Sequence, residues 1–526
     1  MATPSKSLAD KLRRLVRGEV IVEEKALQRF SRDQSIYEIL PAAVVLPKDL
    51  EDVRRLVLFA SEEGLPITPR GGGSGTAGSA LGSGLVMAFP DTAFWGEISG
   101  FSVASGSAQV SVRSGVLHND LQNFLKQKGF FLPADVTSAA ISRIGGNIAT
   151  RASGPHSLKY GPVDRFLEQL EFVTAGGVLI STADASTIPE RFKTSLTALK
   201  NRIRSDDEAR GTLIGRQGLK TASGYNLSAF LEDVTPGQLI MKLLSGSVGT
   251  IGLVTRATLR GEIYEQERSA VLLFFDDLTE AVNVVMDLRT AGAAAIELIS
   301  RETLRIIRDH VPSGSNIDQD AHLLLVEVTG QDSLGRIRAI ADRLRPPAYR
   351  MKTQPQIAAN DDEIEKLWHL RKQILWLIEH PKPELKALAV VNDVGVPISE
   401  LANFVSEVEK IFARHHVIAL IYGHAGEGNL HLRPLFDLSQ PDLQSRIRRL
   451  ADDVYDVVLR HGGTVTSEHG MGRLRAPYLK REWGEALYQY MREVKAIFDP
   501  DGILNPGVMF TDAPITDHMR TDLLQP

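Results

Sequence analysis

Residues 66–84 read PITPRGGGSGTAGSALGSG and hold seven glycines, Gly71, Gly72, Gly73, Gly75, Gly78, Gly82 and Gly84. They follow a predicted strand directly. Because glycine has no Cβ, the backbone N–H groups of such a loop can turn inward and form a nest for a pyrophosphate. The stretch is not a P-loop, since no Gly-Lys-Ser/Thr ends it, and it lacks the strand to long-helix transition of the dinucleotide fingerprint. Alone, it predicts either a phosphate-binding loop or a glycine-rich surface loop without a ligand.

Two further clusters of small residues favour the phosphate-binding interpretation. Residues 133–161, PADVTSAAISRIGGNIATRASGPHSLKYG, supply Gly145, Gly146, Asn147, Ala149, Ser153 and Gly154. Small side chains let a flat ring come close to the backbone, and Asn and Ser can hydrogen-bond its edge. Residues 246–255, GSVGTIGLVT, add Gly246, Gly249, Thr250 and Gly252.

The chain around these loops predicts two α+β domains. Strand AAVVLP, a helix from Asp49 to Gly64 and short apolar runs as far as GTIGLVTRATL place the first domain over residues 41–262. From SAVLLFF to HLLLVEVTG the order strand, helix, strand occurs twice, which is typical of a ferredoxin-like module. This second domain is placed over residues 263–510, with its end returning to the first. Residues 1–40 predict an amphipathic arm or a solvated helical extension, and residues 511–526 a tail.

Composition limits the classes of protein that this chain can be. The 526 residues are 43% hydrophobic and 24% charged, and the formal net charge of −5 offers no overall positive field to nucleic acid or an anionic membrane. The absence of cysteine excludes disulfides, thiol nucleophiles and cysteine-ligated iron–sulfur clusters. No apolar run approaches the length of a transmembrane segment, and the first residues lack the apolar core of a signal peptide. We therefore expect a soluble cytoplasmic protein.

Two stretches of the second domain carry the residues most suited to metal binding, IYGHAGEGNLHLRP at 421–434 and SEHG at 467–470. His424 and His431 would point to opposite faces of one continuous strand, but the glycines between them permit a bend or bulge that lets both imidazoles converge. With Glu468 they form a three-ligand set that leaves a Zn²⁺ or Mn²⁺ ion open for substrate. The alternative is a pair of hydrogen-bonded core histidines beside a tight turn.

The predicted helix DDEIEKLWHLRKQILWLIEH, residues 361–380, places Arg371 within its apolar stripe. A buried cation requires an anion, since leaving it unpaired costs about 3 to 5 kcal/mol, and a bidentate guanidinium suits the carboxylate of a ligand. Arg371 could instead snorkel to the surface or pair with an internal Asp or Glu. Lys386, which opens the strand KALAVVNDVGVP, is a weaker candidate, with a surface position at the strand end as its alternative.

The four stretches RGGGSGTAG, IGGNIATRASGPHSLKYG, GSVGTIGLVT and FDPDGILNPG occur in this order within residues 40–510. They resemble the signatures of the FAD-linked oxidases of the vanillyl-alcohol oxidase type, in the branch that contains D-lactate, glycolate and D-2-hydroxyglutarate dehydrogenases. The resemblance implies an α+β fold with a PCMH-type FAD-binding domain and a ferredoxin-like α+β substrate (cap) domain. It implies FAD contacts from Arg70, Gly71, Gly72, Gly73, Ser74, Gly75, Thr76, Pro133, Asp135, Ser138, Gly145, Gly146, Asn147, Ala149, Ser153, Gly154, Thr250, Gly252 and Asn505. No His lies between Arg70 and Gly84, so we expect non-covalent FAD.

The resemblance also assigns roles in the second domain. His424, His431 and Glu468 match the family's metal ligands, His469 matches the residue proposed as catalytic base, and Arg371 and Lys386 match the carboxylate-binding pair. The chain departs from the family at three positions: Val248 stands where Glu is usual, and Leu375 and Arg433 replace a Thr and an Asn of dicarboxylate-oxidising relatives. Arg433 could bind a distal acidic group or be a surface charge.

Together these observations lead us to expect an FAD-dependent dehydrogenase of a D-2-hydroxy acid. A divalent metal, Zn or Mn, would bind the substrate hydroxyl, His469 would accept its proton, and the Cα hydride would pass to flavin N5, giving a 2-oxo acid. The electrons would then leave to an external acceptor: an iron–sulfur subunit, a quinone, a cytochrome or an electron-transfer flavoprotein. Homodimer formation and the use of oxygen stay open. The alternatives are a flavin-binding subunit of a larger redox complex with little activity alone, and a metal-dependent hydrolase without flavin.

Overall fold

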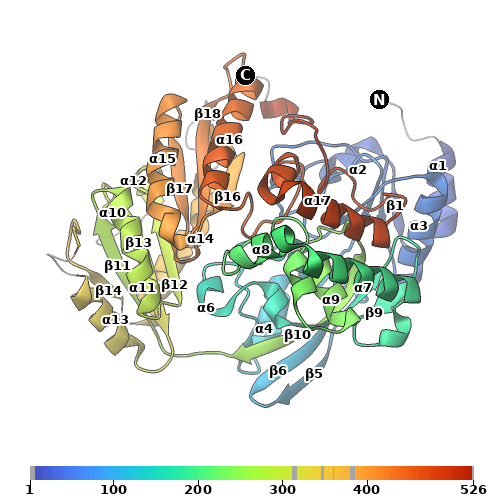
Figure 1. The fold of residues 1–526 in the computed structure, drawn as a ribbon, viewed down its shortest axis with the longest axis horizontal. Helices are drawn as coiled ribbons and strands as arrows, with labels where there is room; N and C mark the ends of the chain where they lie inside the picture. The colour runs from blue at the N-terminus through green and yellow to red at the C-terminus, as the bar shows by residue number, and fades with distance from the viewer. Residues whose placement is uncertain (1–5, 311–316, 345–348, 359, 379–384, 524–526) are drawn as a thin grey trace.

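The computed structural model describes residues 6–310, 317–344, 349–358, 360–378 and 385–523, and these form three β-sheets. In Figure 1 the third sheet and its helices form one lobe, yellow-green to orange, and the first two sheets belong to the other. β10 (Leu253–Ile263) belongs to the second sheet and β11 (Arg268–Phe275) to the third. The chain therefore passes from one lobe to the other at residues 264–267.

The first sheet holds the strand that leads into the glycine-rich loop. Its order is β1-β2-β4-β3, where β2, β4 and β3 are parallel and β1 is antiparallel to β2. The strands are Glu19–Ile21, Ala43–Leu46, Leu85–Ala88 and Ile67–Arg70 in that order. α3 (Leu50–Glu63) packs on this sheet; the Asp49 side chain caps its first turn and Gly64, at φ 61°, ends it. The predicted N-terminal arm supplies α1 (Lys6–Leu15), α2 (Glu24–Leu27) and the edge strand β1.

The second sheet is antiparallel and supports the other glycine clusters. Its order is β5-β6-β10-β8-β9, with β7 also pairing with β10: Ile98–Ala104, Ser107–Arg113, Leu253–Ile263, Leu167–Val173, Leu179–Ser181 and Phe130–Phe131. Around it lie α4 (His118–Lys126), α5 (Ile144–Thr150), α6 (Ser157–Tyr160), α7 (Glu190–Ser205), α8 (Asp207–Gly215) and α9 (Pro236–Leu244). The late helix α17 (Leu479–Phe498), red in Figure 1, shares their hydrophobic core and lies beside α7. The end of the chain thus returns to the first lobe.

The third sheet is covered on both faces. Its order is β14-β11-β13-β12-β17-β18-β15, with β16 also pairing with β18: Gln356–Ala358, Arg268–Phe275, His322–Thr329, Ala295–Ile299, Ala419–His424, Asn429–Asp437, Leu385–Ala387 and Val391–Gly395. Alternate residues of β11 face opposite cores, Leu273 one and Leu272 the other, which explains why its sequence is apolar throughout. One core includes α10 (Leu278–Asn283), α11 (Val285–Thr290), α13 (Ser333–Arg343), α15 (Leu401–Arg414) and α16 (Leu443–Arg460). The other includes α12 (Arg301–Ile306) and α14 (Asp361–Leu377).

The predicted tail packs back on the N-terminal arm. The Tyr37 hydroxyl donates a hydrogen bond to the Ile515 carbonyl at 2.7 Å, and Tyr37 forms a β-bridge with Met519. Within the described ranges, no helix combines the length and the apolar character needed to cross a membrane.

Candidate active site

One cavity of about 460 Å³ is lined both by the glycine clusters and by the histidine stretches. We call its lining residues within 69–80, 136–153 and 247–254 the glycine wall. The polar wall consists of Arg371, Lys372, Asn392, Tyr422, His431, Arg433, Glu468 and His469. Segments from both lobes, far apart in the sequence, therefore face the same space.

The glycine wall fits a cofactor that presses against the backbone. A side chain at Gly146 would meet no protein atom within 4 Å although this residue lines the cavity, so it would occupy the cavity itself. The buried Ser114 and Ser142 hydroxyls also line the cavity and have no hydrogen-bond partner among the described residues. Buried polar atoms beside open space indicate that a polar ligand completes this wall.

Most of the residues expected to contact FAD line this wall. They are Arg70, Gly71, Gly72, Gly73, Ser74, Gly75, Thr76, Ser138, Gly145, Gly146, Asn147, Ala149, Ser153 and Gly252. Pro133, Asp135, Gly154, Thr250 and Asn505 do not line it. Asn505 instead donates hydrogen bonds from Nδ2 to the Ser79 carbonyl at 2.9 Å and to the Val248 carbonyl at 2.7 Å. Since Ser79 and Val248 both line the cavity, Asn505 supports the wall from behind.

Asp135 takes part in a part-buried ion-pair network between the lobes. Its Oδ2 lies 2.6 Å from Nδ1 of His156, whose Nε2 lies 2.9 Å from Oε1 of Glu327 on β13. Burial disfavours the charged imidazole, but the two carboxylates outweigh it and raise the pKa of His156 to about 10. The charged ring therefore joins the glycine-cluster loop to the third sheet.

The two metal-candidate histidines lie on adjacent strands. β17 ends at His424, the 3₁₀ turn η7 (Ala425–Glu427) and Gly428 (φ 68°) reverse the chain, and β18 then pairs His431 with Tyr422. The connection is thus a tight hairpin and not a bulge within one strand. Since side chains two residues apart share a face, the hairpin puts both imidazoles on the same side of the sheet, with ring centroids 5.2 Å apart.

Three imidazoles converge on one oxygen of Glu468. Its Oε1 lies 3.0 Å from Nε2 of His424, 3.4 Å from Nε2 of His431 and 3.7 Å from Nε2 of His469. Burial lowers the pKa of His431 well below its ordinary value, which leaves that imidazole neutral. For His424, burial disfavours the charged ring, but Glu297 and Glu468 outweigh it and raise its pKa to about 9, so a metal would have to displace a proton from this imidazole. Deprotonated imidazoles and a carboxylate that point at one another are the donors that a divalent transition metal takes.

Glu297 on β12, fully buried, orients the first of these histidines. Its Oε1 lies 2.6 Å from Nδ1 of His424, and its Oε2 accepts hydrogen bonds from Arg371, 2.7 Å from Nε and 2.6 Å from an Nη atom. A carboxylate on Nδ1 leaves Nε2 free to face a metal, an arrangement common among metal-binding histidines. Burial opposes ionisation, but His424 and Arg371 outweigh it and lower the pKa of Glu297.

Lys220 holds the other oxygen of Glu468. Its Nζ lies 2.7 Å from Glu468 Oε2 and 2.9 Å from Glu427 Oε2, and Ser153 Oγ donates to the same Glu468 atom at 3.1 Å. Burial disfavours the charged ammonium, but Glu427 and Glu468 outweigh it and raise the pKa of Lys220. Glu468 is therefore turned so that Oε2 faces a fixed cation while Oε1 faces the imidazoles.

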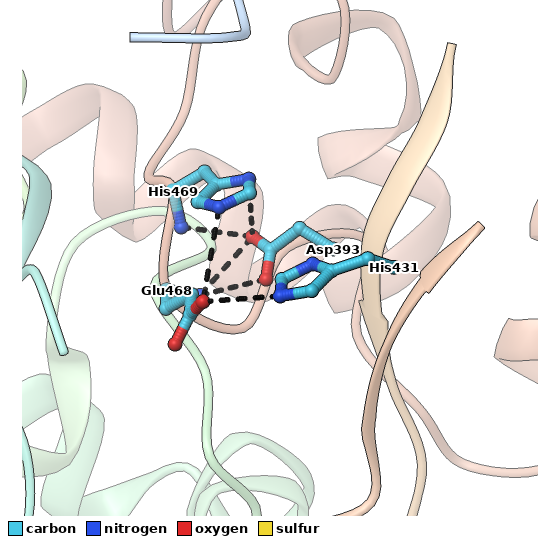
Figure 2. A group of neighbouring side chains, drawn as sticks. All are labelled: Asp393, His431, Glu468 and His469. Atoms are coloured by element: carbon cyan, nitrogen blue, oxygen red, sulfur yellow. Dashed lines mark hydrogen bonds and ion pairs between the residues drawn. The ribbon is translucent and has the colours of Figure 1, made fainter. Parts of the chain in front are cut away.

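Asp393 anchors the loop that carries Glu468 and His469. Figure 2 shows its carboxylate close to both of them and to His431, and the ligand atoms of these four residues all lie within 4.8 Å of one another. The Asp393 carboxylate already accepts hydrogen bonds from the backbone N–H groups of residues 467–469, at 2.8 to 3.2 Å, and from Thr466 Oγ1 at 2.6 Å. Since these donors occupy its oxygens, Asp393 serves as a loop anchor in preference to a metal ligand.

His469 stands between the two walls. Its Nδ1 lies 3.2 Å from Oγ1 of Thr76 in the glycine wall and 3.3 Å from Nδ2 of Asn392, and its ring stacks on His431 with centroids 5.2 Å apart. Burial lowers the pKa of His469, and the positive charges of Arg475 and Arg433 act in the same direction. The imidazole is thus held neutral at the edge of the cavity.

The candidates for carboxylate binding differ in position. Arg371 lines the cavity, but its guanidinium is paired with Glu297, which is the internal pairing foreseen as an alternative. Arg433 also lines the cavity and is buried. Lys386, half-buried in β15, does not line it, and the side chain of Leu375 lies outside the described residues.

Sequence reasoning missed three residues of this network. Glu297 and Asp393 are acids inside the apolar strands AIELI and VNDVG, and an unexplained acid in a buried strand is a usable signal of a polar site. Lys220 stands in a loop without such a pattern, so only the folded structure shows its contact with Glu468.

Comparisons with known proteins identify the fold. The structure aligns with p-cresol methylhydroxylase at a TM-score of 0.69 and 14% identity, covering 97% of this chain and 98% of that one. It aligns with 4-ethylphenol oxidase from Gulosibacter chungangensis at a TM-score of 0.70 and 15% identity, with the same coverage of both chains. The fold is therefore the α+β fold of the p-cresol methylhydroxylase (PCMH) type, as predicted.

The sequence comparisons define the family. Residues 41–183 match the model of the FAD binding domain, and residues 264–509 match that of the FAD linked oxidases, C-terminal domain. The chain belongs to the FAD-linked oxidases, which are oxidoreductases, and its cofactor is FAD.

Several curated relatives act on hydroxy acids by name. Glycolate oxidase subunit GlcD of Bacillus subtilis (strain 168) is 29% identical over 483 residues, 90% of this chain and 90% of the relative. D-2-hydroxyglutarate dehydrogenase of Escherichia coli (strain K12) is 28% identical over 501 residues, 91% of this chain and 49% of the relative, so the chain spans about half the length of that protein. Mitochondrial D-lactate dehydrogenase (cytochrome) of Arabidopsis thaliana is 27% identical over 477 residues, 89% of this chain and 73% of the relative.

Proposed function

We propose that this protein is an FAD-dependent dehydrogenase that oxidises a D-2-hydroxy acid to the 2-oxo acid. The observation that carries the proposal is the single cavity in which His431, Glu468 and His469 face the glycine wall. This shared cavity favours a dehydrogenase over a hydrolase that does not use flavin. The names of the relatives support a hydroxy acid as substrate.

Different residues of the polar wall bind the substrate carboxylate and accept the hydroxyl proton. The guanidinium group of Arg433 offers positive charge to a carboxylate, whereas that of Arg371 is already paired with Glu297. His469 is placed to accept the hydroxyl proton at its imidazole, because it lines the cavity between Thr76 and the Glu468 cluster. FAD, when bound non-covalently on the glycine wall, supplies the hydride acceptor at N5.

His424, His431 and Glu468 would hold a divalent metal, Zn or Mn. Their facing donor atoms and the Glu297 contact on His424 Nδ1 fit such a centre. A metal there supplies Lewis-acid chemistry, lowering the pKa of a bound hydroxyl. Lys220 and Ser153 fix the remaining Glu468 oxygen, so the ligand set is oriented before any metal binds.

We place reoxidation of the flavin on an acceptor outside this chain, because a chain without cysteine ligates no iron–sulfur cluster through thiolates. The proposed acceptor is therefore external: an iron–sulfur subunit, a quinone, a cytochrome or an electron-transfer flavoprotein.

The direct test is anaerobic mixing of the FAD-loaded, metal-replete protein with a panel of D- and L-2-hydroxy acids while the flavin absorbance is followed. We expect bleaching by at least one D-2-hydroxy acid and formation of one 2-oxo acid per flavin reduced. If no member of the panel bleaches the flavin, the proposed reaction class is wrong.

A further inference from the structure

The polar wall contains one buried guanidinium without a counter-ion. Arg433 on β18 is only 7% exposed and lines the cavity. Within the part of the chain that the structure describes, it makes no ion pair, and its Nε atom has no hydrogen-bond partner. An unpaired buried charge is strongly unfavourable, so this position is explained by an anion that enters the cavity.

The other arginine of the polar wall is already neutralised. Arg371 gives Nε and an Nη atom to Glu297, at 2.7 and 2.6 Å, and Glu297 is itself fixed by His424. The wall also contains Lys372, but its side chain is exposed. Of the two buried arginines of this wall only Arg371 has a counter-ion, so the buried positive charge that lacks one is that of Arg433.

The position of Arg433 also indicates which acidic group it would take. Arg433 follows His431 by two residues on β18, so both share one face of the strand, about 7 Å apart along it. Its charge is close enough to act on His469. An anion on Arg433 therefore lies beside the imidazoles proposed to act on the hydroxyl. In a 2-hydroxy acid, the group one bond from the hydroxyl-bearing carbon is the C1 carboxylate.

We infer that Arg433 is the residue that binds the C1 carboxylate of the substrate, and that Arg371 is a positioning residue that orients Glu297 and His424. This inference rests on the proposed function and makes it more specific. It predicts that the site takes 2-hydroxy monocarboxylates as well as dicarboxylates, because recognition needs only the acid next to the hydroxyl.

The test uses two hydroxy acids that cannot be oxidised because their C2 carries no hydrogen. 2-Hydroxyisobutyrate has one carboxylate, and citramalate has two. Their binding to the oxidised, FAD-loaded protein is measured by flavin absorbance titration for the natural sequence, Arg433→Gln, Arg433→Lys and the control Arg448→Gln. The control removes an exposed positive charge on α16, outside the cavity lining.

We expect Arg433→Gln to weaken both acids by a similar factor of about 100, Arg433→Lys to weaken them by about 10-fold, and Arg448→Gln to change neither by more than about 2-fold. If Arg433→Gln weakens the binding of citramalate but not of 2-hydroxyisobutyrate, Arg433 binds the second, distal carboxylate. If the binding of both acids is unchanged, Arg433 binds no substrate anion. Either result overturns the inference. These probes bind without reaction, so the outcome is independent of the bleaching test of the proposed function.

A stability measurement separates anion binding from a merely structural role. Replacing a buried unpaired charge by an apolar side chain of similar length is expected to stabilise the protein without ligand. We therefore expect Arg433→Met to melt at the same temperature as the natural protein or higher when carboxylates are absent. A melting temperature lowered by several degrees would show that Arg433 supports the fold, and would contradict the inference.

Discussion

The glycine wall and the polar wall of the cavity are built in different ways. The glycine wall is mostly backbone, and residues such as Gly146 leave the space that the cofactor needs. The polar wall is made of side chains from α14, β16, β17, β18 and the Ser467–Gly470 loop. Buried charges such as Glu297 and Lys220 fix the Arg371 and Glu468 side chains of this wall. The glycine wall therefore depends on shape, and the polar wall on charge balance.

Among the variants of the two walls, we expect His424→Ala to cause the largest loss of activity. Removing this imidazole takes away a proposed metal ligand, so the rate of flavin reduction by the best D-2-hydroxy acid should fall about 1,000-fold. The glycine wall is untouched, so FAD should remain bound at full stoichiometry. Stopped-flow absorbance measures the rate, and His369→Ala, which removes an exposed imidazole from α14, is the control. Equal rates of flavin reduction in the natural protein and in His424→Ala would show that a metal bound by His424 takes no part in the reaction.

The converse change is Gly146→Val. Its side chain would occupy the cavity without meeting protein atoms, so FAD affinity should fall about 100-fold while the protein stays folded. The matched control is Gly211→Ala on α8, where a Cβ also meets no atom within 4 Å but the residue does not line the cavity. Fluorescence titration with FAD measures both. Full FAD affinity in Gly146→Val would show that the cofactor does not lie on this wall.

Lys220→Met tests charge balance in the polar wall. Without the ammonium, Glu468 Oε2 loses its fixed partner, and metal affinity should fall about 10- to 100-fold, as for other residues that orient metal ligands. Chelator competition gives the dissociation constant. The double variant Lys220→Met with Glu427→Gln removes one buried negative charge as well and should recover part of the fold stability. An unchanged metal affinity in Lys220→Met would mean that Glu468 does not need this partner.

We expect the smallest effect, a pH-dependent loss of stability, from the ion-pair network of Asp135, His156 and Glu327. The pKa of His156 rises from 6.5 to about 10 on folding, so the charged ring stabilises the folded state most below pH 6.5, and this contribution is lost as the pH rises toward 10. The unfolding free energy lost in His156→Gln should therefore be largest at pH 6 and shrink by pH 9.5 in urea titrations. His369→Gln should show no such trend; a pH-independent loss in His156→Gln would contradict the charged network.

The sequence predicts the features that depend on local patterns, but not the contacts between residues that are far apart in the chain. The α3 boundaries at Asp49 and Gly64, and the alternation of strands and helices from SAVLLFF to HLLLVEVTG, follow from local composition and periodicity, and the structure confirms them. The pairing of His424 with Glu297, and of Glu468 with Lys220, joins residues 127 and 248 positions apart. No local pattern encodes such pairs, because the first forms only when β12 and β17 lie side by side in the third sheet, and the second only when the Lys220 loop packs on the Ser467–Gly470 loop. The turn between His424 and His431 was predicted as a break, but its hairpin geometry needed the pairing of β17 with β18.

The central claim is that a metal held by the polar wall and FAD held by the glycine wall act on one substrate. The most direct measurement is anaerobic flavin reduction by a D-2-hydroxy acid before metal removal, after chelation, and after Zn²⁺ or Mn²⁺ is restored. The account predicts that the chelated protein keeps its FAD and its yellow colour, loses reduction by that acid, and regains it with the metal. Reduction at an unchanged rate in protein shown to be free of metal would contradict it.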